Sequence, residues 1–238
     1  MKKISILLIF ILILSMSALS FAGEKQTVLS QEDVIKLVEQ YGGEVLSPSE
    51  VEELNLQVKD NEKDFKTLEE IENSINDIKN RVEKLTSTTI ISETNIKVNV
   101  EDVSEKLISR TVSSSGTNTE VTTVSRTWYQ LDDLDYRAQA SATYEYDYVQ
   151  LPGEPPIISN LRWTDVSSPE VIDLDPGYYN RITNVRNQSV SIISDTKIDH
   201  DYTIDFDYYS FFNGVWFKVA DDSMNGISRY HLDDYTIY

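Results

Sequence analysis

The spacing of apolar residues changes near residue 88 of the chain. Before that point apolar residues recur three and four positions apart, which is typical of amphipathic helices. After it, Thr, Val, Ile and Tyr alternate with polar residues, as in strands with one buried face. Frequent turns and the lack of helices between the strands favour antiparallel sheets. The pattern predicts an α+β protein with a helical segment at 23–87 followed by an antiparallel β-sandwich at 88–238.

Three helix starts are predicted from capping signals in the first segment. Ser30 is followed by an acidic residue three positions later, Asp33. Ser47 precedes a proline and is followed by Glu50, and Thr67 is followed by Glu70. A Ser or Thr with an acid three positions on can satisfy the free amides at a helix start. We therefore expect helices that begin after Ser30, Ser47 and Thr67.

The third of these helices, at 67–85, carries a narrow apolar seam. Its apolar positions are alternately three and four residues apart: Leu68, Ile71, Ile75, Ile78, Val82 and Leu85. That spacing is typical of a coiled coil, which would make the helix a self-association element. A helix packed on a neighbour in the same chain would show the same seam over so short a stretch. Both interpretations stay open at the level of sequence.

Two long amphipathic strands are predicted in the second segment. Residues 136–148 place Tyr and Ala on one face and polar residues on the other, and residues 198–208 alternate in the same way. The stretch Ser113–Asn118 is rich in Ser and contains Gly116, so it predicts a hairpin loop between strands.

Residues 1–22 have the features of a secretory signal peptide. Lys2 and Lys3 precede an apolar run at 4–14, and small residues then lead up to Gly23. The apolar run is about half the length that a membrane span requires. No later stretch has the length to span a bilayer. We expect a secreted, extracellular protein, either released or held non-covalently at the cell surface.

Composition narrows the choice of partners. The chain has 238 residues, a formal net charge of −19 and no cysteine. Such acidity repels nucleic acid and anionic membranes, and it favours a cation or a basic partner. The lack of cysteine means that the fold must stand without disulfides. The abundance of Lys, Ile and Asn is typical of a Gram-positive bacterium with AT-rich DNA.

An acidic ladder on the second long strand is the candidate metal site. Its members are Asp199, Asp201, Asp205 and Asp207. Residues two apart on a strand point the same way, so these carboxylates would repel one another unless a cation lay between them. Calcium prefers carboxylate oxygens and is the candidate cofactor. The alternative is a solvated strand face that keeps the protein soluble.

Catalytic motifs are absent from the sequence, and we expect a protein that is not an enzyme. The two histidines are His200, which lies in line with the apolar residues of the second long strand and is expected to be buried or half-buried, and His231, near Asp233 and Asp234. No serine has the surroundings of a catalytic nucleophile. An extracellular hydrolase is therefore only the third hypothesis for function.

Aromatic residues near proposed turns are candidates for ligand contact. Tyr178 and Tyr179 follow Pro176-Gly177 and are the candidate binding residues for a protein or a glycan. The tryptophans Trp128, Trp163 and Trp216 are expected to fill the core.

A family resemblance gives a second hypothesis for function. The signal peptide, the helical segment with Phe65–Glu72, the alternating stretch Ala140–Tyr148, and Trp163 followed by Asn187–Ile192 resemble secreted Gram-positive bacteriocins of the closticin 574 type. The resemblance implies a bacteriocin-like or toxin-like effector with residues 23–87 as a removable leader. The first hypothesis remains a secreted, non-enzymatic binding protein.

Overall fold

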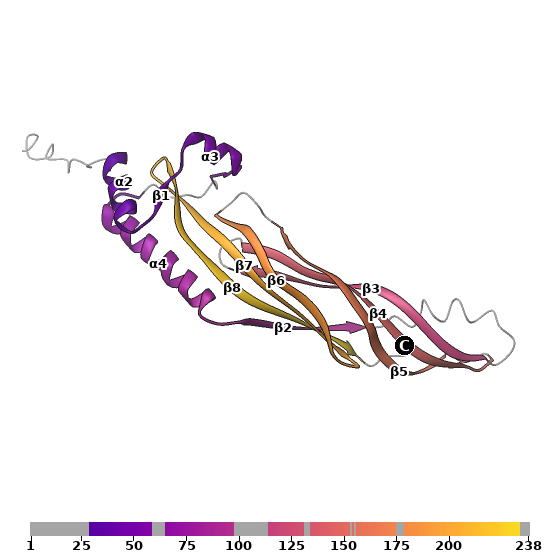
Figure 1. Ribbon diagram of the computed structural model, residues 1–238. Helices are drawn as coiled ribbons and strands as arrows, with labels where there is room; N and C mark the ends of the chain where they lie inside the picture. Colours follow the sequence, from indigo (N-terminus) through magenta and orange to yellow (C-terminus); the bar gives the residue numbers. More distant parts are fainter. Residues whose placement is uncertain are drawn as a thin grey trace, which may run out of the picture.

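The computed structural model describes residues 29–58, 65–97, 114–130, 134–152, 154, 156–174 and 179–233. Helices come first in this part of the chain: α2 (Gln31–Gln40), α3 (Pro48–Glu53) and α4 (Leu68–Thr86), with β1 (Glu44–Val45) between α2 and α3. The longer strands follow: β2 (Ile90–Lys97), β3 (Ser114–Gln130), β4 (Leu134–Gln150), β5 (Ile157–Asp173), β6 (Asn180–Ser194), β7 (Lys197–Phe212) and β8 (Val215–Asp233). The helices gather at one end of an elongated molecule (Figure 1).

All three predicted helix starts are confirmed. The side chains of Ser30, Ser47 and Thr67 each accept a hydrogen bond from the backbone three residues on. Glu50 and Glu70 complete the capping boxes of α3 and α4. None of the described helices has the length and apolar character that crossing a membrane requires.

The described strands form two sheets and are mostly antiparallel. The first sheet has the order β1-β8-β7-β6, and β2 also pairs with β8; the second has the order β3-β4-β5. The β2–β8 pair is parallel, a feature that the sequence pattern did not predict. The structure is thus an antiparallel β protein with a few N-terminal helices.

Both long strands have the faces that the alternation predicted. The even-numbered residues of β4 from Leu134 to Tyr146 are buried, and so are those of β7 from Ile198 to Tyr208. The odd-numbered residues of β4 are mostly half-buried or exposed.

The predicted hairpin loop at Ser113–Asn118 is wrong for the residues that the structure describes. Residues 114–118 are the first part of β3 and pair with residues 146–150 of β4. Gly116 does not break the strand because the Tyr148 ring lies over it, with the ring and its hydroxyl 3.3–3.5 Å from where a Cβ would be. A cross-strand aromatic ring that covers a glycine offsets its lack of a side chain.

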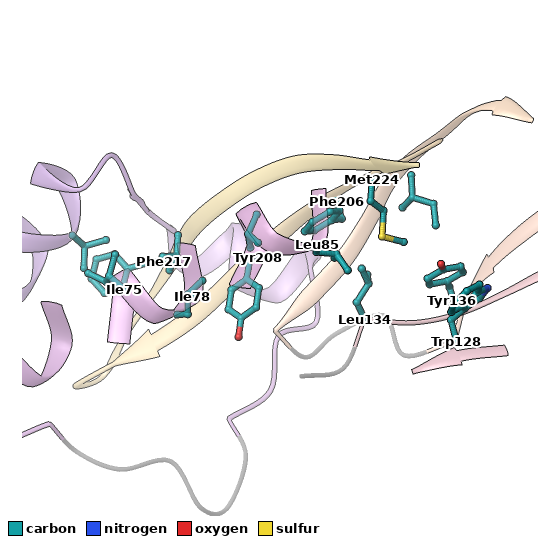
Figure 2. Packing of buried hydrophobic residues seen from close by; sticks show 14 of the residues in the cluster. Ile75, Ile78, Leu85, Trp128, Leu134, Tyr136, Phe206, Tyr208, Phe217 and Met224 are labelled. Carbon is teal, nitrogen blue, oxygen red and sulfur yellow. The ribbon is translucent and has the colours of Figure 1, made fainter. Parts of the chain in front are cut away.

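The apolar seam of α4 is buried within the chain. Ile71, Ile75, Ile78, Val82 and Leu85 are all buried, in one cluster with α2 and with residues of β4, β7 and β8. Figure 2 shows Ile75 and Ile78 of α4 alongside Phe217 of β8. The intrachain interpretation of the seam therefore holds in this structure, and self-association through 67–85 would require the cluster to open.

A second cluster joins the two sheets at the end away from the helices. It combines Ala140, Tyr144 and Tyr146 of β4 with Ile198 of β7 and Tyr230 of β8. The first cluster also includes residues of both sheets, among them Trp128, Leu134 and Tyr136 opposite Tyr202 and Phe206. The helical segment and the strands thus share a hydrophobic core.

Candidate interaction surface

The acidic ladder lies on the odd-numbered face of β7, and three of its four members, Asp199, Asp205 and Asp207, form ion pairs with basic residues of other strands. Arg229 of β8 holds both oxygens of Asp199 at 2.7 Å. Asp205 lies 2.8 Å from Arg186 of β6. The hydrogen bonds that Arg186 and Ser223 donate to this carboxylate lower the pKa of Asp205.

The other two ladder residues do not complete a metal site. Asp207 lies 2.8 Å from Lys218 of β8. Burial raises the pKa of Asp201, and the charge of neighbouring Asp199 adds to that effect while Arg229 opposes it. Among the residues that the structure describes, no three metal-binding side chains come together. Calcium therefore stays a prediction from the sequence, without a coordination geometry.

The two histidines lie in different surroundings. His200 is fully buried, its ring is 5.2 Å from that of Tyr202, and neither ring nitrogen has a hydrogen-bond partner among the described residues. Burial lowers the pKa of His200 from 6.5 to about 4. His231 lies 3.9 Å from Glu93. The two histidines do not form a catalytic pair with a described serine.

Tyr179 packs in a small aromatic cluster at the helical end. Its ring centroid lies 6.1 Å from that of Trp216, and the ring centroid of Phe211 lies 5.3 Å from that of Trp216. Tyr179 is half-buried there. Tyr178, the other predicted binding residue, lies outside the described residues. Trp128, Trp163 and Trp216 are all buried, as the sequence predicted.

Strand β3 presents the most exposed large apolar side chains in the described structure. Tyr129 is 77% exposed and Val121 is 73% exposed. Both belong to the odd-numbered, outward face of β3, where the residues between them are Thr123, Ser125 and Thr127. An exposed tyrosine offers a large rigid contact area at a low entropic cost. We call this odd-numbered row, residues 117–129, the β3 surface.

The backbone of β3 is regular along its whole length. All 17 residues pair with β4 in one continuous antiparallel register from Ser114↔Gln150 to Gln130↔Leu134. The β4–β5, β6–β7 and β7–β8 pairs each contain register shifts. Within the described chain, no strand pairs with the other edge of β3. That edge is therefore a long row of backbone donors and acceptors.

The side chains of β3 lack the usual protection of an edge. Natural sheets protect such edges with lysines, prolines or bulges. Strand β3 contains no lysine and no proline, and its only charged residues are Glu120 and Arg126. Glu120 accepts hydrogen bonds from the hydroxyls of Tyr144 at 2.8 Å and Tyr146 at 3.2 Å. Arg126 is exposed beside the Trp128 ring.

The sequence pattern missed this surface. The many Thr and Val residues and the aromatic pair Trp128-Tyr129 favour a strand, but they do not say whether that strand lies at an edge. The absence of lysine and proline over residues 114–130 was the signal that could have pointed to it.

Comparison with known proteins adds no identification. No family model, no curated protein and no solved structure matches the chain.

Proposed function

We propose that this chain is a secreted, non-enzymatic binding protein of a Gram-positive bacterium that recognises another polypeptide along strand β3. In this proposal its two sheets form an open β-sandwich, and the partner adds an extended strand to the second sheet. Backbone hydrogen bonds would supply affinity, and pockets for alternate side chains would supply specificity. The observation that carries the proposal is the regular edge of β3, with which no described strand pairs, on a strand that exposes Val121 and Tyr129.

Packing of the helices favours this function over the bacteriocin-like alternative. A removable leader at 23–87 would take α2 and α4 with it, and these helices place Val34, Val38 and Ile75 in the shared core. Loss of that cover would expose the matching apolar residues of β7 and β8 to water.

Intact-mass spectrometry of the exported chain tests this point. The binding proposal expects the mass of a chain that starts at Gly23, and a removable leader expects the mass of a chain that starts near Thr88.

Binding at β3 can be tested with peptides selected from a random display library of about 15 residues, the span of one long strand. The β3 variant carries Val121→Lys and Thr123→Lys, which place two charges on the outward face of the strand. The matched control carries Ile157→Lys and Ser159→Lys, an exposed apolar residue and an exposed hydroxyl two positions apart on β5 of the same sheet. Both variants should keep wild-type stability within about 0.5 kcal/mol, since all four positions are exposed.

The expected result is a set of peptides that bind the wild type and the control pair but lose affinity at least tenfold on the β3 pair. Hydrogen exchange on the complex should then show new protection in residues 114–130. Peptides that bind all three proteins alike, or a selection that yields no binder to a chain that sediments as a monomer, would overturn strand addition at β3 as the function.

A further inference from the structure

The sequence of β3 is complementary to itself in one antiparallel register. When Thr123 is placed opposite Thr123 of a second copy, Glu120 faces Arg126 of that copy, because each lies three positions from Thr123. A twofold axis at Thr123 gives this pair twice, once from Glu120 of each copy to Arg126 of the other. Opposite charges directly across a strand pair stabilise it, and like charges destabilise it. The two charged residues of β3 are thus spaced for pairing with their own sequence.

The backbone satisfies the same register. In an antiparallel pair, residues that point their N–H and C=O groups outward alternate with residues that point them inward. The register about Thr123 pairs odd-numbered residues with odd-numbered ones and even-numbered residues with even-numbered ones. Each backbone N–H or C=O that points outward from one copy therefore faces an outward-pointing group of the other copy. It spans Gly116 to Gln130, within the part of β3 that runs without a bulge against β4.

The charge of the whole chain favours this edge for a contact between copies. Two molecules of net charge −19 repel each other over most of their surfaces. Strand β3 has one acidic and one basic residue, so the strand itself is neutral. Glu120 Oε2 accepts one described hydrogen bond, from Tyr144, which leaves it acceptor capacity for an arginine.

We propose that the polypeptide recognised by β3 is a second copy of this chain, paired antiparallel about Thr123. The result is a twofold dimer in which one continuous sheet takes three strands from each copy. Val121 and Tyr129 of both copies then lie on one shared outer face. This inference rests on the proposed strand addition at β3, and it names the partner and the register.

Single-cysteine variants test the register, because the chain has no cysteine of its own. Thr123→Cys places two thiols opposite each other, where the Cα atoms of facing residues are about 4.5–5.5 Å apart and a disulfide can form. Thr119→Cys is the matched control, an exposed threonine on the same face that the register places opposite Thr127. Mild oxidation should cross-link Thr123→Cys, leave Thr119→Cys alone uncross-linked, and cross-link a mixture of Thr119→Cys and Thr127→Cys.

Charge variants give an independent test by sedimentation at micromolar concentration. Glu120→Arg or Arg126→Glu alone places like charges opposite each other twice and should weaken self-association by about tenfold or more. An equal mixture of the two variants restores both opposite-charge pairs and should form a heterodimer. Damage to the fold of the Glu120→Arg monomer would not be repaired by mixing.

The outcomes separate this inference from the proposed function. A chain that sediments as a monomer at high micromolar concentration, or cross-links that form equally at all three cysteine positions, overturns the second copy as the partner. Selected peptides that still compete at β3 would then leave strand addition standing with another occupant. A dimer that is insensitive to the β3 variants would place the contact elsewhere and overturn the inference.

Discussion

The outer edge of β8 and the outer edge of β3 differ in what lies against them. β1 pairs with the first part of β8, β2 pairs with its last part, and α4 packs against the same strand. Nothing in the described chain pairs with the outer edge of β3. Both strands are long enough to recruit another strand. The N-terminal segments β1, β2 and α4 thus cover the outer edge of the first sheet, whereas no described segment pairs with the β3 edge of the second sheet.

Strand β5, at the far side of the second sheet, shows a third treatment of an edge. It contains Pro169, and both Asn160 and Ser168 have a positive φ of 52°. Its pairing with β4 shifts register three times along the strand. Proline and bulges interrupt the row of backbone groups that a new strand would need. The contrast between β5 and β3 therefore lies partly in local sequence, which makes it open to mutation, and partly in contacts such as the 2.7 Å hydrogen bond from the Trp163 backbone N–H of β5 to the Asp195 carbonyl.

Removing the cover from β8 should have the largest effect on stability. Ile75→Ala deletes a fully buried side chain of α4 and should lower the free energy of unfolding by about 2–5 kcal/mol. Leu68→Ala on the same helix is the control, because Leu68 is partly exposed and its loss should cost less than about 1 kcal/mol. Urea denaturation measures both. Equal losses would mean that α4 does not hold the first sheet together.

Acid should weaken the first sheet before it affects β3. The pKa of His200 is lowered from 6.5 to about 4 by burial, so between these values the unfolded chain binds a proton that the folded chain does not. Stability from this group is complete above pH 6.5 and falls as the pH drops towards 4, by up to about 3 kcal/mol.

The His200→Leu variant isolates that effect. Its free energy of unfolding should depend less on pH between 6.5 and 4 than that of the wild type, when both are followed by urea denaturation. Hydrogen exchange should show faster opening of β7 than of β3 in acid for the wild type only. An identical pH dependence in the two proteins would remove His200 as the cause.

Two glycines covered by tyrosines give the smallest and most direct comparison of the strands. A Cβ on Gly226 of β8 would lie 2.3 Å from the Tyr202 ring, whereas a Cβ on Gly116 of β3 would lie 3.3 Å from Tyr148. Gly226→Ala should therefore cost about 1–3 kcal/mol through overpacking. Gly116→Ala should change the free energy of unfolding by less than about 1 kcal/mol, since alanine restricts the unfolded chain and the half-buried Tyr148 ring needs to shift by only a few tenths of an ångström. Thermal denaturation of the two variants measures both changes in stability. A larger loss of stability in Gly116→Ala than in Gly226→Ala would contradict the packing described at the β3 edge.

The local features of this fold could be predicted from sequence, because short-range physics determines them. Ser30, Ser47 and Thr67 cap helices since a hydroxyl satisfies a nearby amide, whatever the rest of the chain does. The alternation in β4 and β7 predicted which face is buried, and it placed His200 in the core. These predictions depend on neighbours within a few residues.

Features that depend on strand order could not be predicted in the same way. Asp199 was predicted as a cation ligand, and the structure instead places Arg229 opposite it because β7 and β8 pair in that register. Gly116 was assigned to a loop because nothing in its local sequence shows that Tyr148 would cover it. The position of β3 at the edge of the described second sheet likewise depends on strand order and not on the sequence of β3 alone.

The pairing of β2 with β8 constrains the order in which parts of the chain can fold. Ile90 pairs with Gly226, so an early segment of the chain must wait for the last described strand before its ladder can form. Contacts between residues so far apart in sequence close slowly, because the loop between them loses entropy first. During synthesis, the seam of α4 stays without the β8 residues that cover it until that strand emerges. In the unfinished chain, Ile71, Ile75 and Ile78 would therefore form an exposed apolar stripe that a chaperone could bind. In the folded protein the same residues are buried.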